Sequence, residues 1–243
     1  MATATQVKLR TKYSVEDHAT WARLFARQKA LVADYACKEF LAGSKKLALD
    51  SKHVPDQRRV SARINRMTGW KLSSAGNITM SMEDWFVAMK KRSFPVTDYI
   101  RKPEHFDYSA TPDLFHEYFG HLPFLTDKKF AAMAQKFGDM CSRANKRQLL
   151  HISRIWSLGV EFGMIKEKGK IKFLGAGLLS SYGESKHAMN MIKKGKVVPF
   201  DLKTVIATSG RTYEYHKKYF IVDTMSDIMD ALTAYGKKEG LVH

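Results

Sequence analysis

The sequence predicts a single domain that is mainly helical, with a few small β elements. Apolar residues recur at the spacing of helices in most long segments, whereas only short β-branched or aromatic runs have the pattern of strands. No linker rich in proline, glycine or serine divides the 243 residues, and no internal repeat is present. An apolar content of 44% with 12% aromatic residues is typical of ordered globular proteins. We therefore expect one domain over residues 1–243.

Three helices are predicted in the first hundred residues, at 14–41, 55–67 and 81–92. In the first, Ser14 is a suitable N-cap, and Gln28 is the one polar residue that interrupts the apolar stripe. The second ends before Gly69, because glycine readily adopts the left-handed conformation of a helix C-terminus. Ser81 begins the third, with a carboxylate three positions later.

The segment that follows residue 110 carries a stronger helix signal. Thr111-Pro112-Asp113 combines a hydroxyl N-cap, a proline at the first helical position and a carboxylate in the first turn. The helix that it begins contains two histidines and is expected to end near Pro123. The remaining predicted elements are helices at 127–143, 146–164 and 225–235, a hairpin of strands 164–166 and 170–173, and strands at 197–205 and 219–222.

The formal net charge of +17 raises the question of an acidic partner. Lysine and arginine are spread along the chain in doublets and triplets such as Lys90-Lys91-Arg92, without long runs. No known nucleic-acid-binding motif accompanies them. We interpret the charge as a solvated basic surface and do not expect binding to nucleic acid.

Membrane insertion and export are not indicated by the sequence. No apolar stretch approaches the roughly 18 residues that a membrane span requires, and the first thirteen residues lack the apolar core of a secretory signal. Cys37 and Cys141, the only cysteines, are not spaced as a metal-binding pair, and free thiols suit a reducing compartment. We therefore expect a cytoplasmic protein.

The spacing of His116 and His121 bears on metal binding. Residues five apart on a regular helix point about 140° away from each other, whereas residues four apart differ by only about 40°. The zinc-protease arrangement of two histidines four apart is absent, because position 120 is glycine. For both imidazoles to reach one ion, the helix must loosen near its end, where Gly120 and Pro123 flank His121. Without such loosening, both histidines would simply be core residues.

Glu161 strengthens the case for a metal. It lies in the apolar run Ile155-Trp156-Ser157-Leu158-Gly159-Val160-Glu161-Phe162-Gly163-Met164. A buried carboxylate without a partner costs several kcal/mol or shifts its pKa far upward, so Glu161 requires a cation. A lysine such as Lys166 is one alternative. Two imidazoles and one carboxylate suit non-haem iron(II), with zinc as the competing metal.

Four strings in the sequence resemble those of a known family. The string from Thr111 to Pro123 is similar to the signature of the pterin-dependent aromatic amino acid hydroxylases: proline-aspartate, two residues, His-Glu, two residues, Gly-His. The others, all in the order of that family, are Phe94-Pro95-Val96-Thr97-Asp98-Tyr99-Ile100-Arg101, Val160-Glu161-Phe162-Gly163 and Gly175-Ala176-Gly177-Leu178-Leu179-Ser180-Ser181-Tyr182-Gly183-Glu184. The resemblance is strongest over residues 56–222 and implies the catalytic fold of that family.

The resemblance implies roles for nine residues. His116, His121 and Glu161 match the iron ligands. Glu117 matches a carboxylate beside the iron that orients water and the pterin. Arg101 matches the arginine that pairs with the substrate carboxylate, and Trp85 aligns with the ring on which the pterin stacks. The remaining positions that border the bound amino acid are Ser109, Ser180 and Trp156.

The sequence departs from the family pattern in two places. The pterin loop reads Ser73-Ser74-Ala75-Gly76-Asn77-Ile78-Thr79, with a different length. Ser157 stands where relatives have a large ring that borders the substrate pocket, so the pocket is either wider or filled by a neighbour. The chain also resembles the short bacterial form, without the regulatory domain and tetramerising helix of the animal enzymes, and we expect a monomer.

The function that follows is an iron(II)- and tetrahydropterin-dependent monooxygenase, with tetrahydrobiopterin or a related pterin as the cofactor. It would use O2 to convert L-phenylalanine to L-tyrosine. Tryptophan is the alternative substrate because of Ser157. A more remote alternative is a zinc metallohydrolase with Glu117 as its general base.

Overall fold

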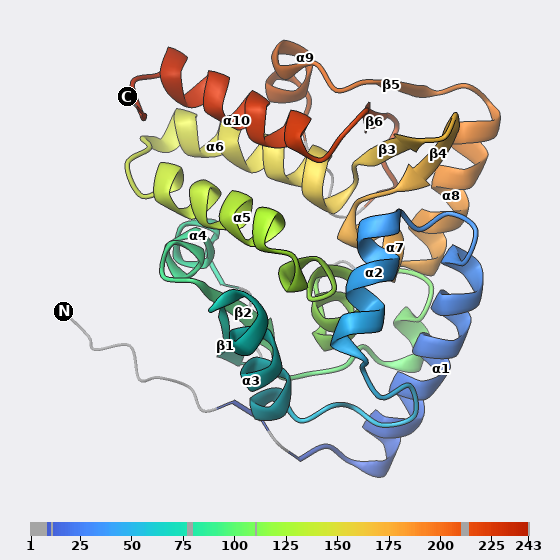
Figure 1. The fold of residues 1–243 in the computed structure, drawn as a ribbon. Coiled ribbons are helices and arrows are strands. Elements are labelled where there is room, and N and C mark those ends of the chain that lie inside the picture. Colours follow the sequence, from blue (N-terminus) through green and yellow to red (C-terminus); the bar gives the residue numbers. More distant parts are fainter. Residues whose placement is uncertain (1–8, 11, 77–79, 110, 210–213, 243) are drawn as a thin grey trace.

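Helices form most of the computed structural model, which describes residues 9–10, 12–76, 80–109, 111–209 and 214–242 (Figure 1). Two small sheets lie in different parts of the molecule. One contains β1 and β2, and the other contains four strands in the order β4-β3-β6-β5. The mainly helical fold with small β elements is thereby confirmed. Within the described part of the chain, no helix has the length and apolar character to cross a bilayer.

The N-terminal helix predicted over 14–41 is two helices, α1 (Val15–Val32) and α2 (Lys38–Leu47). The prediction of Ser14 as the N-cap is confirmed, because its hydroxyl accepts a hydrogen bond from the amide of Asp17. The prediction of one continuous helix over 14–41 was wrong. Between the two helices, the chain forms an isolated β-bridge between Ala36 and Phe173, and the Cys37 amide donates to the Phe173 carbonyl at 3.1 Å.

The next segment builds the smaller sheet. Helix α3 (Gln57–Thr68) is capped by Asp56 and ends at Gly69, whose φ of 76° requires the left-handed region. Strand β1 (Lys71–Gly76) follows, and α4 (Met82–Lys90) leads to β2 (Ser93–Thr97), which pairs with β1 in parallel. Ser81 caps α4 as predicted. The sequence did not predict β1 or β2.

The middle of the chain contains two π-helical segments. After the short helix η1 (Pro103–His105), η2 covers His116–His121 and η3 covers Phe124–Thr126. Helices α5 (Lys128–Cys141) and α6 (Lys146–Trp156) follow, and α6 continues into η4 (Ser157–Glu161). The predicted first turn at residues 111–113 is wrong by a few residues, because Asp113 itself caps the helix by accepting from the His116 amide at 3.0 Å.

The C-terminal third builds the larger sheet and the helices around it. The predicted hairpin is confirmed as β3 (Met164–Glu167) and β4 (Lys170–Phe173), and the last strand as β6 (Tyr219–Val222). The strand predicted over 197–205 was too long. Only β5 (Val197–Pro199) is a strand, because Asp201 then caps helix α9 (Leu202–Ala207). The other helices are α7 (Ala176–Ser180), α8 (Tyr182–Lys193) and α10 (Ser226–Lys238).

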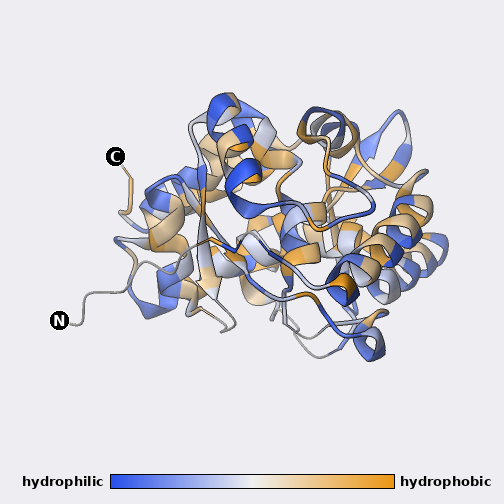
Figure 2. Ribbon diagram, turned by 90° about the horizontal axis from the view of Figure 1, so that it is seen from below, coloured by the Kyte–Doolittle hydropathy of each residue, from blue (hydrophilic) through white to orange (hydrophobic). Residues whose placement is uncertain are grey.

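The core is rich in aromatic rings and holds the two π segments in place. Fully buried rings include Trp21, Phe115, Tyr118 and Phe137, and polar and apolar stretches alternate along the surrounding helices (Figure 2). Gln28, the polar interruption in α1, is buried and donates to the Ser185 hydroxyl at 2.9 Å. Its side chain therefore joins α1 to α8.

Candidate metal centre

The π geometry of η2 brings the two predicted histidines together. The Leu122 amide donates to the carbonyl of Glu117 at 3.1 Å, five residues earlier. Such a wide turn places residues five apart above one another, which a regular helix does not. The widened helix therefore places His116 and His121 on the same side, although they are five residues apart. The predicted loosening near the end of the helix is confirmed in the form of this π turn, which ends at His121, just before Pro123.

Glu161 reaches the same point from a second π segment. The Phe162 amide donates to the Ser157 carbonyl at 2.9 Å, again five residues apart. Nε2 of His121 lies 2.9 Å from Oε1 of Glu161 and 3.2 Å from Nε2 of His116, while Nε2 of His116 lies 3.6 Å from Oε2 of Glu161. One donor atom from each residue falls within 4.8 Å of the others. This donor set suits one divalent metal ion.

Electrostatics favour cation binding at these three groups. Burial lowers the pKa of His116 to about 4, so its ring is neutral near pH 7. Burial opposes ionisation of Glu161, but His121, His116 and the Trp156 indole outweigh it and lower the pKa of Glu161 to about 2. A carboxylate beside a neutral imidazole is the protonation state that a metal requires.

Neighbouring side chains hold two of the three groups in orientation. The Ser180 hydroxyl donates to the Ala176 carbonyl at 2.8 Å and lies 2.8 Å from Nδ1 of His116. Its one proton is thus used, so Nδ1 of His116 is the donor and Nε2 keeps its lone pair for a metal. The Trp156 indole donates to Oε1 of Glu161 at 2.8 Å. Nδ1 of His121 is buried without a hydrogen-bond partner among the described residues.

A pocket of about 250 Å3 adjoins the candidate metal position. Four predicted site residues line it together with His116: Arg101, Ser109, Glu161 and Ser180. Ser157 and Phe162 also line it, so the serine that replaces a large ring does face this space. The pocket is an open cleft beside the donor set, with room for a small organic substrate.

Arg101 lies at the edge of the pocket in a buried ion pair. Its Nε and Nη2 donate to the two carboxylate oxygens of Asp113 at 2.9 and 2.6 Å. Burial opposes the charge on Asp113, but Arg101 outweighs it and lowers the pKa of the carboxyl. Nη1 of Arg101 has no hydrogen-bond partner among the described residues. The geometry therefore leaves one nitrogen of a fixed guanidinium for an anionic group.

Four predicted residues do not line this pocket, as far as the described residues define it: the metal-ligand candidate His121, and Trp156, Trp85 and Glu117. Trp156 contacts Glu161, as described above. Trp85 packs on Trp156, with ring centroids 5.1 Å apart, and so lies one layer behind Glu161. Glu117 is buried, and its Oε2 is unpartnered. Burial, then the charges of Glu161 and Asp113, raise the pKa of Glu117 well above its usual range. The expected pterin loop lies partly outside the described residues, at 77–79.

Close backbone contacts lock the three site segments together. A Cβ at Gly120 would lie 2.8 Å from the Ala176 carbonyl oxygen, and one at Gly175 would lie 2.2 Å from that of Glu161. Only glycine permits these approaches. Helix α7 thus packs directly against both π segments, and Ser180 at its end reaches His116.

Sequence reasoning missed a buried polar cluster beside the pocket. Oε1 of Glu184, a pocket-lining residue, accepts from the Tyr219 hydroxyl at 2.5 Å and lies 3.1 Å from Nδ1 of His216. The His216 ring lies 3.9 Å from that of Phe162. The available signal was the glutamate that ends the string 175–184. The cluster fixes Phe162, which follows Glu161.

Two imidazoles, one carboxylate and an adjoining pocket define the class of non-haem metal enzymes with open coordination positions. The model of the biopterin-dependent aromatic amino acid hydroxylase family matches residues 4–240. The chain belongs to this family. Members of the family use iron and a pterin, which agrees with the donor set described above.

Individual relatives show the same likeness. The phenylalanine-4-hydroxylase of Chromobacterium violaceum is 35% identical over 221 residues, 90% of this chain and 74% of that protein. The crystal structure of that enzyme with bound Fe(III) has a TM-score of 0.86 and covers 93% of this chain and 82% of that one. The tyrosine 3-monooxygenase of Rattus norvegicus is 32% identical, but only 46% of it is covered. The chain therefore resembles the bacterial phenylalanine-4-hydroxylases over most of their length.

Proposed function

We propose that this protein hydroxylates L-phenylalanine to L-tyrosine with O2, iron(II) and a tetrahydropterin. The observation that carries the proposal is the junction of two π segments, which places His116, His121 and Glu161 around one point beside a pocket with Arg101 at its edge. When bound, iron(II) and the reduced pterin together activate O2 for insertion of one oxygen atom into the ring.

The residues of the chain then have distinct tasks. His116, His121 and Glu161 would hold the iron, and Ser180 and Trp156 keep two of those side chains in orientation. Arg101, fixed by Asp113, binds the amino acid carboxylate with its unpartnered Nη1. Ser109 lies on the same pocket wall. Together these contacts point the aromatic ring toward the metal position.

Glu117 and Trp85 serve the pterin in this proposal. The buried, unpartnered oxygen of Glu117 is the observation that fits a hydrogen-bonding heterocycle. Trp85 is half-buried and offers an aromatic ring for stacking.

Tryptophan is a second candidate substrate because Ser157 lines the pocket. The deciding experiment supplies the iron(II)-loaded protein with tetrahydropterin, O2 and each aromatic amino acid, and identifies the products. We expect tyrosine from phenylalanine. Exclusive formation of hydroxytryptophan would show that the substrate is tryptophan and not phenylalanine.

The variant that tests the metal ligands is Glu161→Gln, with Glu104→Gln, an exposed carboxylate on η1, as its control. The first should lose bound iron and turnover, since an amide is a weaker ligand than a carboxylate. The second should keep both. Stoichiometric iron and full turnover in Glu161→Gln would contradict the ligand assignment. Metal content and initial rate are the two measurements.

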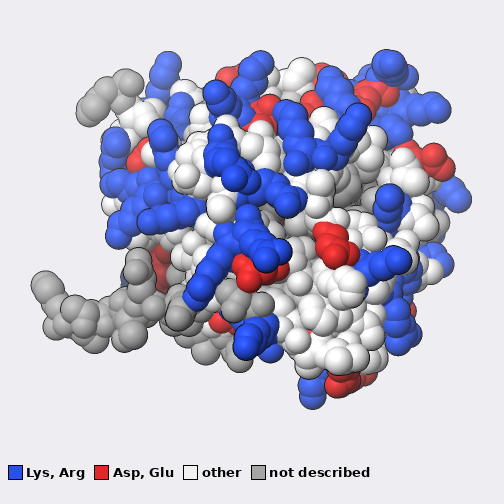
Figure 3. Space-filling model, turned by 60° about the horizontal axis from the view of Figure 1, so that its bottom comes forward, with Lys and Arg blue, Asp and Glu red and all other residues white. Residues whose placement is uncertain are grey.

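We also propose a cytoplasmic monomer. Cys37 and Cys141 are buried free thiols, which suit a reducing compartment. On the face that Figure 3 shows, many lysine and arginine side chains lie among fewer acidic groups and uncharged residues. Light scattering at several protein concentrations tests the oligomeric state, and a mass that doubles with concentration would reject the monomer.

A further inference from the structure

A second hollow of about 490 Å3 lies between α1, α2 and η2. Its lining shares no residue with that of the metal-centre pocket. The volume falls within the range of about 300–1,000 Å3 that is usual for small-molecule sites. Nothing in the proposed reaction uses this hollow, which we call the α1–α2 groove.

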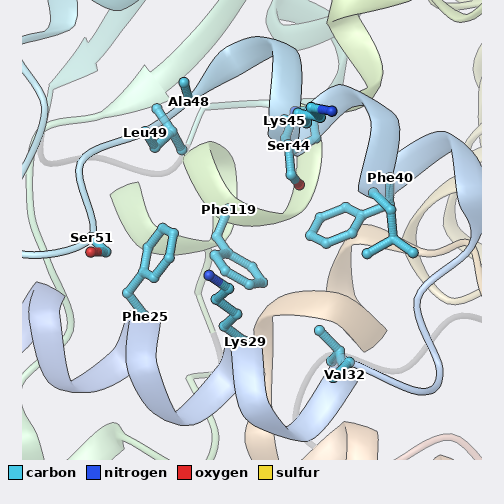
Figure 4. Close-up of a pocket in the computed structure, with 13 residues that line it drawn as sticks. Phe25, Lys29, Val32, Phe40, Ser44, Lys45, Ala48, Leu49, Ser51 and Phe119 are labelled. Carbon is cyan, nitrogen blue, oxygen red and sulfur yellow. The ribbon is translucent and has the colours of Figure 1, made fainter.

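The floor of the α1–α2 groove is aromatic. The ring of Phe119 lies 5.2 Å from that of Phe25 and 5.5 Å from that of Phe40, between centroids. Figure 4 shows these three rings facing the space between the two helices. Val32 adds an aliphatic wall, and Leu41 at the rim is 49% exposed. Such a surface favours a hydrocarbon occupant, because burying it removes apolar area from water.

The polar groups of the α1–α2 groove carry one sign of charge. Lys29 extends from α1 toward Phe119, while Lys45 and Ser44 lie across the space on α2, with the Ser44 hydroxyl on the side of the rings (Figure 4). The lining contains no aspartate or glutamate. Neither lysine forms an ion pair with another residue in the described part of the chain. A ligand here therefore meets two cations and a hydroxyl donor.

We propose that the α1–α2 groove binds a medium-chain fatty acid. Its carboxylate pairs with Lys29, which extends into the groove, while its hydrocarbon chain lies over Phe25, Phe40 and Phe119, and Lys45 adds positive charge on the opposite side. Amino acids fit less well, because no carboxylate in the lining can pair with an α-ammonium group. The occupant is thus a single-chain monoanion, distinct in chemistry from the substrate at the metal centre.

The location gives such a ligand contact with the metal-binding segment. Phe119 belongs both to the groove floor and to η2, between the two histidines. Its ring stacks on that of Phe115 at 5.0 Å. The bound chain would pack on the side of η2 that carries Phe119. The inference does not rest on the identity of the metal or on turnover.

The test is calorimetric titration of the full chain with decanoate, at decanoate concentrations below those at which decanoate itself aggregates. Decyltrimethylammonium, with the same tail and the opposite charge, is the matched ligand. We expect one saturable decanoate site and no comparable binding of the cation. Equal binding of both, or many decanoate molecules per chain, would overturn the proposal.

Two variants locate the site. Lys29→Ala combined with Lys45→Ala should weaken decanoate binding by roughly tenfold, since an ion pair and a second positive charge are lost. Lys38→Ala combined with Lys46→Ala, two exposed lysines of α2 outside the lining, should leave it unchanged. Ser44→Trp should abolish binding by filling the groove. Unweakened binding in both the first double variant and Ser44→Trp, with unchanged circular dichroism, would reject this location.

Discussion

The hydroxyl group of Ser180 decides which nitrogen of His116 faces the metal position. Because that hydroxyl donates to the Ala176 carbonyl, it can only accept from Nδ1 of His116. The tautomer is therefore set by the backbone of α7. One residue thus serves two purposes, because it also lines the pocket where a substrate would lie.

The buried pair of Arg101 and Asp113 gives a prediction at the residue scale. Asp113→Ala removes both acceptors from a buried guanidinium and should destabilise the fold by about 3–5 kcal/mol. It should also raise the KM for the amino acid more than it lowers kcat, because Arg101 loses its orientation. Urea unfolding and steady-state kinetics measure the two effects.

The control for this prediction is Asp107→Ala. Asp107 pairs with Arg27 at 2.7 Å, but its side chain is 69% exposed, so the loss should stay within about 1 kcal/mol. An Asp113→Ala variant as stable as this control would show that the buried pair contributes nothing beyond a surface pair.

The residues of the candidate site differ in how far the sequence could predict them. Glu161 was identifiable because a carboxylate in an apolar run needs a partner. The family strings then singled out Arg101 and the histidines. Asp113 was mistaken for an ordinary first-turn carboxylate, because only the fold shows that Arg101 lies beside it. Glu184 was missed since its partners, His216 and Tyr219, are about thirty residues away.

At the scale of elements, the glycine contact between α7 and η4 gives a second prediction. In Gly175→Ala the new methyl group would meet the Glu161 carbonyl oxygen at 2.2 Å, so the backbone must shift. We expect Glu161 to move and iron affinity to fall, together with a destabilisation of about 1–3 kcal/mol. Iron titration and thermal unfolding measure both.

Gly159→Ala is the matched control for this change. It lies in η4, the segment that Gly175 contacts, but its Cβ would meet side-chain ends of Ile228 and Phe200, at 3.2 Å. These can adjust at smaller cost. If Gly159→Ala lost iron and Gly175→Ala retained it, the proposed role of the α7 contact would be wrong.

The elements that the sequence predicted well are those with local signals. Ser14, Ser81 and Gly69 mark helix ends through their own hydrogen bonds or dihedral angles. Strand β1, by contrast, is a polar run that becomes a strand only through pairing with β2, and Pro95 within β2 argues against a strand. The break between α1 and α2 likewise depends on a bridge to distant Phe173.

At the scale of the whole molecule, we propose that residues 1–243 unfold as one domain. A single buried cluster runs from Trp21 to Leu241 and includes residues of both sheets. Tryptophan fluorescence and far-ultraviolet circular dichroism should therefore report the same transition in urea. Tryptophans at 21, 70, 85 and 156 sample separate parts of the chain. Two separate transitions would show that the chain contains two domains that unfold independently.

The same burial predicts how the thiols behave. Burial raises the pKa of Cys37 and of Cys141, and both side chains are enclosed in the core. In the folded protein we expect neither thiol to react with an aromatic disulfide reagent while the urea-unfolded chain reacts completely. Absorbance of the released thiolate measures this. Rapid reaction of the native protein would place a thiol at the surface.

The π turn of η2 makes the length of this segment as important as its composition. Deleting one residue between His116 and His121 would restore a regular helix with histidines four apart, which is the spacing of zinc proteases. The two histidines would then differ by about 40° around a regular helix axis, so their positions relative to Glu161 would change. Over this stretch, natural variants should rarely gain or lose a residue.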